Sequence, residues 1–135
     1  MSKKSLLILG AGQYGQVVRE TAEAMGCFSK IAFLDDNSPL AIGKMAEYDL
    51  PVLIHPKAYV SPSALLGKAT IVEPLAVVNT GAVVEQGGLL CAGCVVNHNA
   101  HVMPVCQIDC NAIVASNATV PEGTKVCSGV VYERK

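Results

Sequence analysis

From residue 60 onward, an apolar residue recurs at every sixth position. The phase never slips as far as Val126, and each of these positions holds Val, Leu or Ile. A small residue stands two positions before each of them, and three positions after comes most often Gly or Asn, which tolerate the positive φ of a tight corner. The aliphatic positions are Val60, Leu66, Val72, Val78, Val84, Leu90, Val96, Val102, Ile108, Val114, Val120 and Val126.

A fixed short period with one aliphatic, one small and one corner position predicts a β-solenoid. Each hexad supplies a short strand and a corner, and neither buries its apolar side alone, so successive coils must stack. The composition agrees, because apolar residues make up 51% of the chain while aromatic residues make up 4% and Trp is absent. That balance suits a narrow core of thin aliphatic layers.

The first fifty or so residues follow a different pattern, which predicts a strand, a helix and a second strand. Ser5–Leu9 and Ile31–Leu34 are short apolar strands, and the helical periodicity between them ends at Gly26, in the position of a C-terminal cap. Pro51–Ile54 is expected to be a last strand of this part, and His55-Pro56 marks the junction with the repeat. One helix face carries Tyr14, Val17, Val18, Thr21, Ala22 and Met25.

A glycine-rich turn lies between the first strand and the helix. Its form, G-x-G-x-x-G with acidic residues about twenty positions further on, is typical of a dinucleotide-binding turn. A single unit of two strands and one helix is too short for a dinucleotide site, which favours a mononucleotide or a sugar nucleotide diphosphate. The alternative, that the glycines only let helix and strand pack closely, stays open. The candidate substrate-binding residues are Gly10, Gly12, Gly15, Asp35 and Asp36.

Charge and cysteine usage narrow the function classes. A net charge of −1 gives no electrostatic footprint for nucleic acid or an anionic membrane, and Met1–Lys4 leads into an apolar run too short for a signal peptide or a membrane span. We therefore expect a cytoplasmic protein.

Spacings such as Cys91-x2-Cys94 suggest metal binding, but Cys94 and Cys106 occupy the inward small position and cannot turn outward to complete a zinc site. Reduced thiols and no metal are expected.

Three motifs in combination resemble a known family. They are Leu9-Gly10-Ala11-Gly12-x-x-Gly15, Phe33-Leu34-Asp35-Asp36, and the run from His55-Pro56 to Ala64. They are similar to the sugar acyltransferases with a left-handed β-helix, namely the bacterial nucleotide-amino-sugar N-acetyltransferases and the sialic acid O-acetyltransferases. The resemblance implies a Rossmann-like domain that binds a UDP-sugar, then a left-handed parallel β-helix with triangular coils of three hexads. It also implies a homotrimer with acetyl-CoA between neighbouring β-helices.

The resemblance sets the expected domain boundaries. Residues 1–55 form a shortened Rossmann-like cap, residues 56–129 a left-handed β-helix of about four coils, and residues 130–135 a C-terminal tail. Four coils span ~19 Å at the usual strand spacing. Family members have a longer cap and several more coils, and some carry a histidine where this chain has Tyr14.

Two positions compete for the family's catalytic histidine. The family turn Asn-Thr-Gly-Ala-x-x-Asp/Glu-His matches residues 79–86 by sequence, which puts Gln86 in the place of the histidine. A count without gaps from His55-Pro56 instead reaches His98, and the unbroken hexad phase favours this count. The predicted catalytic residues are therefore His98 as the general base and Asn99, which like Asn97 fixes a tautomer without supplying charge.

The remaining candidate residues concern assembly and the coenzyme. With three hexads per coil, Tyr59, Val77, Val95 and Ile113 share the outer side of one face, and an apolar stripe of this kind is expected to be covered by another subunit. The corner that holds His98 borders this stripe. His101, which is outward in mid-face, and Gln107, which replaces a second family histidine near the coenzyme, are the predicted cofactor-binding residues.

The sequence thus predicts an acetyl-CoA-dependent acyltransferase that modifies an amino or hydroxyl group of a nucleotide-linked sugar. The alternative is a catalytically inactive trimeric scaffold, or a nucleotide-sugar-binding relative, that kept the fold. The feature that separates the two hypotheses is the shortened solenoid after His98. Neither hypothesis involves nucleic acid, membrane insertion or a metal.

Overall fold

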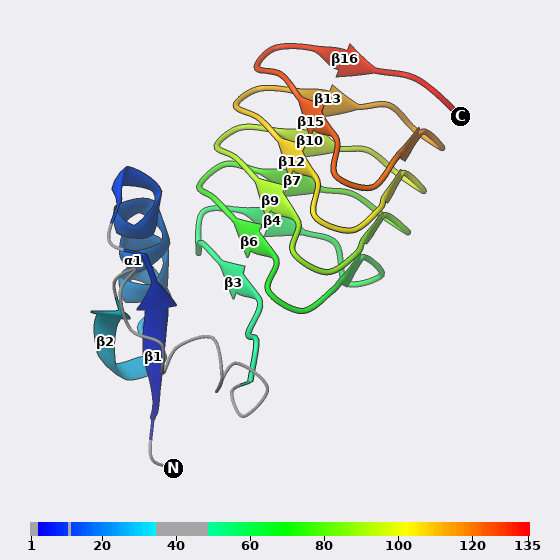
Figure 1. The fold of residues 1–135 in the computed structure, drawn as a ribbon. Coiled ribbons are helices and arrows are strands. Elements are labelled where there is room, and N and C mark those ends of the chain that lie inside the picture. Colours follow the sequence, from blue (N-terminus) through cyan, green and yellow to red (C-terminus); the bar gives the residue numbers. More distant parts are fainter. Residues whose placement is uncertain (1–2, 11, 35–48) are drawn as a thin grey trace. The chain divides into compact units, whose positions relative to one another are not determined.

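A computed structural model describes residues 3–10, 12–34 and 49–135 (Figure 1). The chain divides into two compact units, Met1–Leu50 and Pro51–Lys135. The candidate acidic residues Asp35 and Asp36 lie outside the described residues.

The N-terminal unit contains two parallel strands and one helix in its described part. Strand β1 spans Lys4–Leu9, helix α1 spans Gln13–Met25, and strand β2 spans Phe28–Leu34. Strand β2 begins three residues before Ile31, where the apolar run predicted its start. The helix ends as predicted at Gly26, whose φ of 64° is left-handed and whose N–H donates to the Glu23 carbonyl at 3.0 Å. The described part of this unit is a small α/β region.

The second unit is a parallel β-solenoid built from two-residue strands, each followed by a corner (Figure 1). The strands are β3 (Leu53–Ile54), β4 (Tyr59–Val60), β5 (Leu65–Leu66), β6 (Ile71–Val72), β7 (Val77–Val78), β8 (Val83–Val84), β9 (Leu89–Leu90), β10 (Val95–Val96), β11 (His101–Val102), β12 (Gln107–Ile108), β13 (Ile113–Val114), β14 (Thr119–Val120), β15 (Lys125–Val126) and β16 (Val131–Tyr132). They begin at every sixth residue, as the hexad period predicts.

The strands stack into three parallel sheets, which form the three faces of the solenoid. Their orders are β3-β6-β9-β12-β15, β4-β7-β10-β13-β16 and β5-β8-β11-β14. Val95 pairs with Val77 in the coil before and with Ile113 in the coil after, a shift of three hexads in each direction. Three hexads per coil is therefore confirmed for this chain.

The solenoid extends one hexad beyond each predicted end. The strand expected to close the N-terminal part, Leu53–Ile54, instead pairs with Ile71–Val72 of the solenoid. At the other end, Val131–Tyr132 of the expected tail pairs with Ile113–Val114. The reason is the six-residue phase itself, because Ile54 precedes Val60 by one period and Tyr132 follows Val126 by one period.

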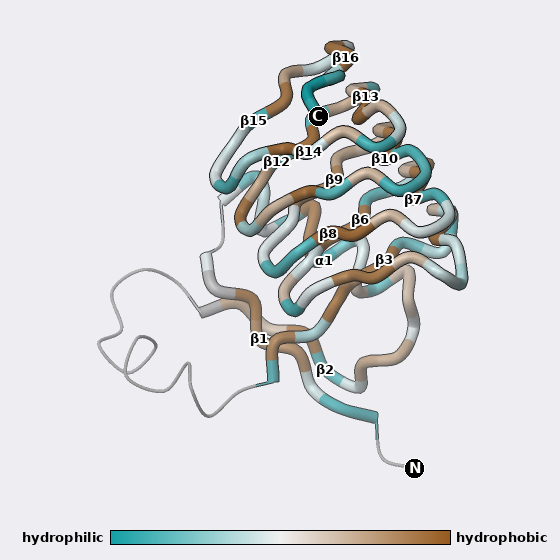
Figure 2. The backbone as a smooth tube through the Cα atoms, turned by 90° about the vertical axis from the view of Figure 1, so that its right-hand side faces the viewer, coloured by the Kyte–Doolittle hydropathy of each residue, from teal (hydrophilic) through white to brown (hydrophobic). Residues whose placement is uncertain are grey.

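The interior is filled by the aliphatic and small positions of each hexad. From Val72 to Val126 the residues in the aliphatic position of each hexad are at most 3% exposed, and Cys94 and Cys106 lie among them in the small position. Figure 2 shows the result along the tube, where apolar strands alternate with polar corners. Burial of aliphatic surface and the inter-coil hydrogen bonds hold each coil on its neighbours.

The corners repeat a left-handed residue at the third corner position. Of the twelve predicted corner positions all but Ser63 have positive φ. Gly and Asn occupy most of them, but Val105 has a φ of 51° with its side chain 59% exposed. A β-branched residue in this region is strained, and nothing in its burial offsets the strain.

We expect Val105→Asn to stabilise the solenoid by about 1 kcal/mol, because Asn tolerates left-handed backbone and Val does not. Asn111, in the same corner position with φ 57°, supplies the matched reverse change, and Asn111→Val should destabilise by a similar amount. Urea unfolding at fixed protein concentration measures both. A lower midpoint for Val105→Asn than for wild type would contradict this account of the corners.

Candidate active site

His98 lies in the corner that follows β10, in the second corner position. Its side chain is exposed, as is that of Asn99, the next residue and the left-handed one of this corner. The corner is tied to the coils on either side by backbone hydrogen bonds, Asn99 N–H to the Thr80 carbonyl at 3.0 Å and Asn117 N–H to the His98 carbonyl at 3.2 Å. His98 is therefore presented to solvent from a fixed backbone.

The imidazole of His98 is held by a hydroxyl from the next coil. Nε2 of His98 lies 2.8 Å from Oγ of Ser116, which occupies the same position of the corner one coil later. Asn97 does not hold the ring, since its Oδ1 accepts the backbone N–H of His98 at 2.8 Å and the amide of Asn79 at 3.2 Å. The side chain of Asn99 packs over Gly81 instead of turning toward the ring.

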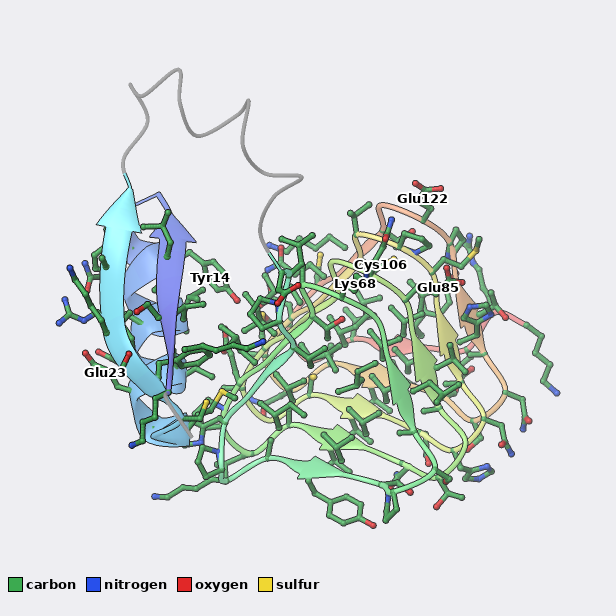
Figure 3. The ribbon with its side chains drawn as sticks, turned by 90° about the horizontal axis from the view of Figure 1, so that it is seen from below. Tyr14, Glu23, Lys68, Glu85, Cys106 and Glu122 are labelled. Carbon is green, nitrogen blue, oxygen red and sulfur yellow. The ribbon has the colours of Figure 1, made fainter. Side chains whose placement is uncertain are left out.

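A second histidine is paired with a carboxylate. Nε2 of His101, on β11, lies 2.5 Å from Oε1 of Glu85, in the corner after β8. Both side chains are partly exposed. Figure 3, which looks along the stack of coils, shows Glu85 on the same side of the solenoid as Glu122. Sequence reasoning named His101 but missed Glu85, although the register that pairs His101 with Val83 brings the corner after β8 close to it.

The other sequence candidates lie on different faces. Gln86 lies in the same corner as Glu85 and is exposed. Gln107 is half-buried on β12, and its Nε2 lies 3.8 Å from Sγ of Cys91. The sheet that contains β12 is the one opposite the corner of His98, so a single chain does not bring Gln107 and His98 together.

The predicted apolar stripe is present on the sheet β4-β7-β10-β13-β16. In register along it lie Tyr59, Val77, Val95 and Ile113, and the structure adds Val131 at its end. Tyr59 is 55% exposed and Val131 is 51% exposed. Leu75, exposed in the corner before β7, extends the apolar surface. The corner of His98 directly follows β10 of this sheet.

In the glycine loop, the three glycines differ in what they do. Gly10 has a φ of 94°, and a Cβ on Gly15 would run into the Gly10 carbonyl oxygen, so Gly15 is required for packing. Gly12 is the N-cap of α1, where a Cβ would meet open space and no side chain caps the first turn. The N-terminus of a helix suits an anion, because its backbone N–H groups point along the axis toward a ligand.

The buried cysteines of the solenoid are held in the protonated form. Burial raises the pKa of Cys91 to about 12, with the nearby Glu73 carboxylate adding to the effect. Burial likewise raises the pKa of Cys94 to about 12 and raises the pKa of Cys106. Glu73 is itself buried, and its Oε2 accepts the N–H of Ala92 at 2.8 Å. These thiols are structural rather than nucleophilic.

Within the described part of the chain, no three His, Cys, Asp or Glu side chains gather in an arrangement that could hold a metal ion. No helix in that part is long and apolar enough to cross a membrane.

The N-terminal part matches a known family. Residues 5–61 match the model of the PglD N-terminal domain, which covers the glycine loop and the His55-Pro56 junction. No curated protein matches the sequence.

Solved structures match almost the whole chain. The acetyltransferase domain of PglB from Neisseria gonorrhoeae FA1090 is 27% identical over 97% of this chain and 83% of that one, with a TM-score of 0.89. The same domain in complex with acetyl coenzyme A gives 26% identity over 98% and 83%, again with 0.89. A histidine-to-asparagine mutant of perosamine N-acetyltransferase from Caulobacter crescentus, in complex with CoA and GDP-perosamine, shares the fold at 19% identity, 96% and 93% coverage and a TM-score of 0.56.

These matches confirm the resemblance to the hexapeptide-repeat sugar acetyltransferases. The chain consists of an N-terminal α/β region followed by a parallel β-solenoid. Acetyltransferase structures solved in complex with acetyl-CoA or CoA have the same fold.

The pKa shifts predict which thiols react. At about pH 8 an aromatic disulfide reagent should modify Cys27, Cys110 and Cys127 quickly, because the side chains of these three are exposed to the reagent. The pKa values of Cys91, Cys94 and Cys106 are raised, so these thiols should react only after unfolding. The measurement is the fast and slow amplitude of thiol release with and without denaturant. More than three fast thiols would contradict the burial described.

Proposed function

We propose that the protein is an acetyl-CoA-dependent acyltransferase acting on an amino or hydroxyl group of a nucleotide-linked sugar in the cytoplasm, with His98 as the general base. The observation that supports it most is the exposed imidazole of His98 on a rigid corner, beside an exposed apolar sheet face. The fold is that of an acetyltransferase domain solved with acetyl coenzyme A.

Acetyl transfer from a thioester requires a general base and an acceptor group held close to the thioester carbonyl. The amine or hydroxyl attacks the thioester carbonyl while the imidazole removes its proton, a task suited to a side chain whose unperturbed pKa lies near neutrality. Coenzyme A leaves as the thiol. Backbone N–H groups at a solenoid corner are the available donors for the oxyanion.

His98 is a better candidate for this base than His101. Nε2 of His101 is already engaged by the Glu85 carboxylate, and its other ring nitrogen lies on the backbone side of the ring. Nε2 of His98 is engaged only by a hydroxyl, which gives and takes protons readily. We assign His101 a role beside the coenzyme rather than in proton removal.

The proposal includes a homotrimer. The apolar stripe needs cover, and a second copy would supply it. In one chain Gln107 lies on the sheet opposite the corner of His98, so both can line one coenzyme site only if they come from different chains. Acetyl-CoA would then lie between neighbouring solenoids, whose coils we take to be left-handed from the family resemblance.

For the acceptor, we propose that the N-terminal unit works as a Rossmann-like cap for a UDP-sugar. The helix N-terminus and the open space at Gly12 support a phosphate there, while Gly10 and Gly15 set the shape of the loop. Asp35 and Asp36 would meet the ribose or base.

A second candidate function is a non-catalytic trimeric scaffold or nucleotide-sugar-binding relative. One observation favours it: the ring of His98 has a hydroxyl as its partner, rather than a carboxylate that would stabilise an imidazolium at this corner. Acetyl transfer by the wild type separates the two functions.

If His98 is the base, His98→Ala should lose roughly a hundredfold or more of the acetyl transfer rate, because no other group at this corner removes the proton. His101→Ala should lose much less. Coenzyme A release with acetyl-CoA and a panel of UDP-amino sugars measures both. Gln86→His is the control for the competing sequence alignment and should not raise activity. Full activity of His98→Ala would end the assignment, and an inert wild type would favour the scaffold.

If the stripe is the trimer seam, Val95→Glu should dissociate the oligomer, because a charge would then be buried without a partner. Val83→Glu is the matched control, since Val83 holds the same outward position on another sheet. Light scattering coupled to size exclusion gives the mass of each. A monomeric wild type, or equal masses for the two variants, would contradict the proposal that the apolar stripe is the trimer interface.

The glycine loop gives a third outcome to measure. Gly12→Val should abolish UDP binding by filling the space at the helix N-terminus, and it should leave the fold intact because a Cβ there meets nothing within 4 Å. Gly15→Ala is unsuitable, since it clashes with the Gly10 carbonyl. Calorimetry with UDP supplies the test. Equal binding by Gly12→Val and wild type would show that the loop is structural only.

A further inference from the structure

Leu75 is a strained and exposed apolar residue at a corner of the solenoid. Its φ of 63° is left-handed, and its side chain is 66% exposed, more than any other large apolar side chain among the described residues. Leucine is unfavourable there on both counts, because Gly or Asn would remove the backbone strain and the apolar contact with water. Residues held in such strain cluster at binding and active sites. The exposure of Leu75 therefore favours a contact with another molecule.

The corner of Leu75 is a narrow ridge without outward charge. It joins the sheet β3-β6-β9-β12-β15 to the sheet of the apolar stripe. Pro74 precedes Leu75, and one coil later the same two corner positions hold Ala92 and Gly93, which are small. The acidic side chain beside them, Glu73, is buried and accepts the N–H of Ala92 at 2.8 Å. These residues define the Leu75 corner.

The other two corner columns match an apolar surface less well. The corners after β5, β8 and β14 carry Lys68, Glu85 and Glu122 (Figure 3). If they were buried against an apolar sheet, these charges would lose their solvation. The corner after β10 carries His98, which has to stay open to a substrate if it is the base. The Leu75 corner is therefore the one whose charge and polarity match the stripe.

We propose that the Leu75 corner of one chain packs on the apolar stripe of the next, with Leu75 as the anchor beside Val77 and Val95. This packing rests on the homotrimer of the proposed function and adds the surface that covers the stripe. Two unlike surfaces that bind head to tail close into a ring under three-fold symmetry. The contact is confined to the coils of Leu75 and Ala92, so the exposed Cys110, one coil higher, stays open to reagents.

The packing also determines which face of the next chain meets the corner of His98. Chains in a ring wind in the same sense, so their coils run in opposite directions where two chains touch. The stripe sheet leads into the corner of His98, and the sheet β3-β6-β9-β12-β15 leads into the Leu75 corner. The latter sheet of one chain, which carries Gln107, therefore borders the corner of His98 in the other. The coenzyme groove then has walls from two chains, and a single chain holds an incomplete site.

The first experiment compares two substitutions that relieve the same strain at different corners. Leu75→Asn and Val105→Asn should each raise the urea midpoint of the separated chain, because Asn tolerates left-handed backbone. Leu75→Asn alone should also weaken the trimer, raising the concentration at which it dissociates by roughly tenfold or more, as loss of an interface anchor does. Sedimentation velocity of the full chain over a range of concentrations measures this difference.

The second experiment identifies the surface that Leu75 meets. Under ultraviolet light, Leu75→p-benzoylphenylalanine should link two chains. Mass spectrometry on mixed unlabelled and nitrogen-15-labelled protein should place the link in the peptide of Val77 or Val95 of the second chain. Val105→p-benzoylphenylalanine is the matched control, since Val105 is also left-handed and 59% exposed, and it should give no link between chains.

Equal weakening of the trimer by Leu75→Asn and Val105→Asn would overturn this packing and leave the trimer and the acetyl transfer of the proposed function standing. A link from position 75 to a surface other than the stripe would do the same. A monomeric wild type would overturn the packing and the trimer together. A link to the stripe in a protein that transfers no acetyl group would support the packing and count against the proposed function alone.

Discussion

The structure depends on the stacking of one coil on the next at a register of three hexads. An aliphatic side chain every sixth residue gives each coil a layer of the core, and the backbone N–H and carbonyl groups of each strand are satisfied only by the coils above and below. Because the register is constant, residues three hexads apart form columns. Tyr59, Val77, Val95 and Ile113 form one such column, and His98 and Ser116 belong to another.

That constraint explains what the sequence could predict. The hexad phase predicted the strands, the inward thiols Cys94 and Cys106, and the left-handed corners, because each follows from a local six-residue pattern. It stopped one hexad short at either end, at Ile54 and Tyr132, since the first hexad looked like part of the cap and the last like a tail. The N-terminal strands and helix followed from ordinary periodicity.

The partners of the two histidines could not be predicted with the same ease. Ser116 follows His98 by three hexads, so the register alone places the two residues in one column. A serine in a corner is common, however, and its residue type does not indicate a contact with the imidazole. Glu85 is harder, since its contact with His101 depends on how a side chain leans from one coil's corner to another coil's strand. Hydrogen bonds between exposed polar side chains depend on rotamers, and a repeat pattern does not encode these.

The central claim is that acetyl-CoA binds at the corner of His98. The chain has three histidines, so the imidazole signals of the protein labelled at histidine are assignable from one substitution each. Titration with acetyl-CoA, followed by nuclear magnetic resonance, should shift and saturate the signal that disappears in His98→Gln, with a smaller shift at His101 and none at His55. No change at any imidazole, or a change at His55 or His101 alone, would contradict the account.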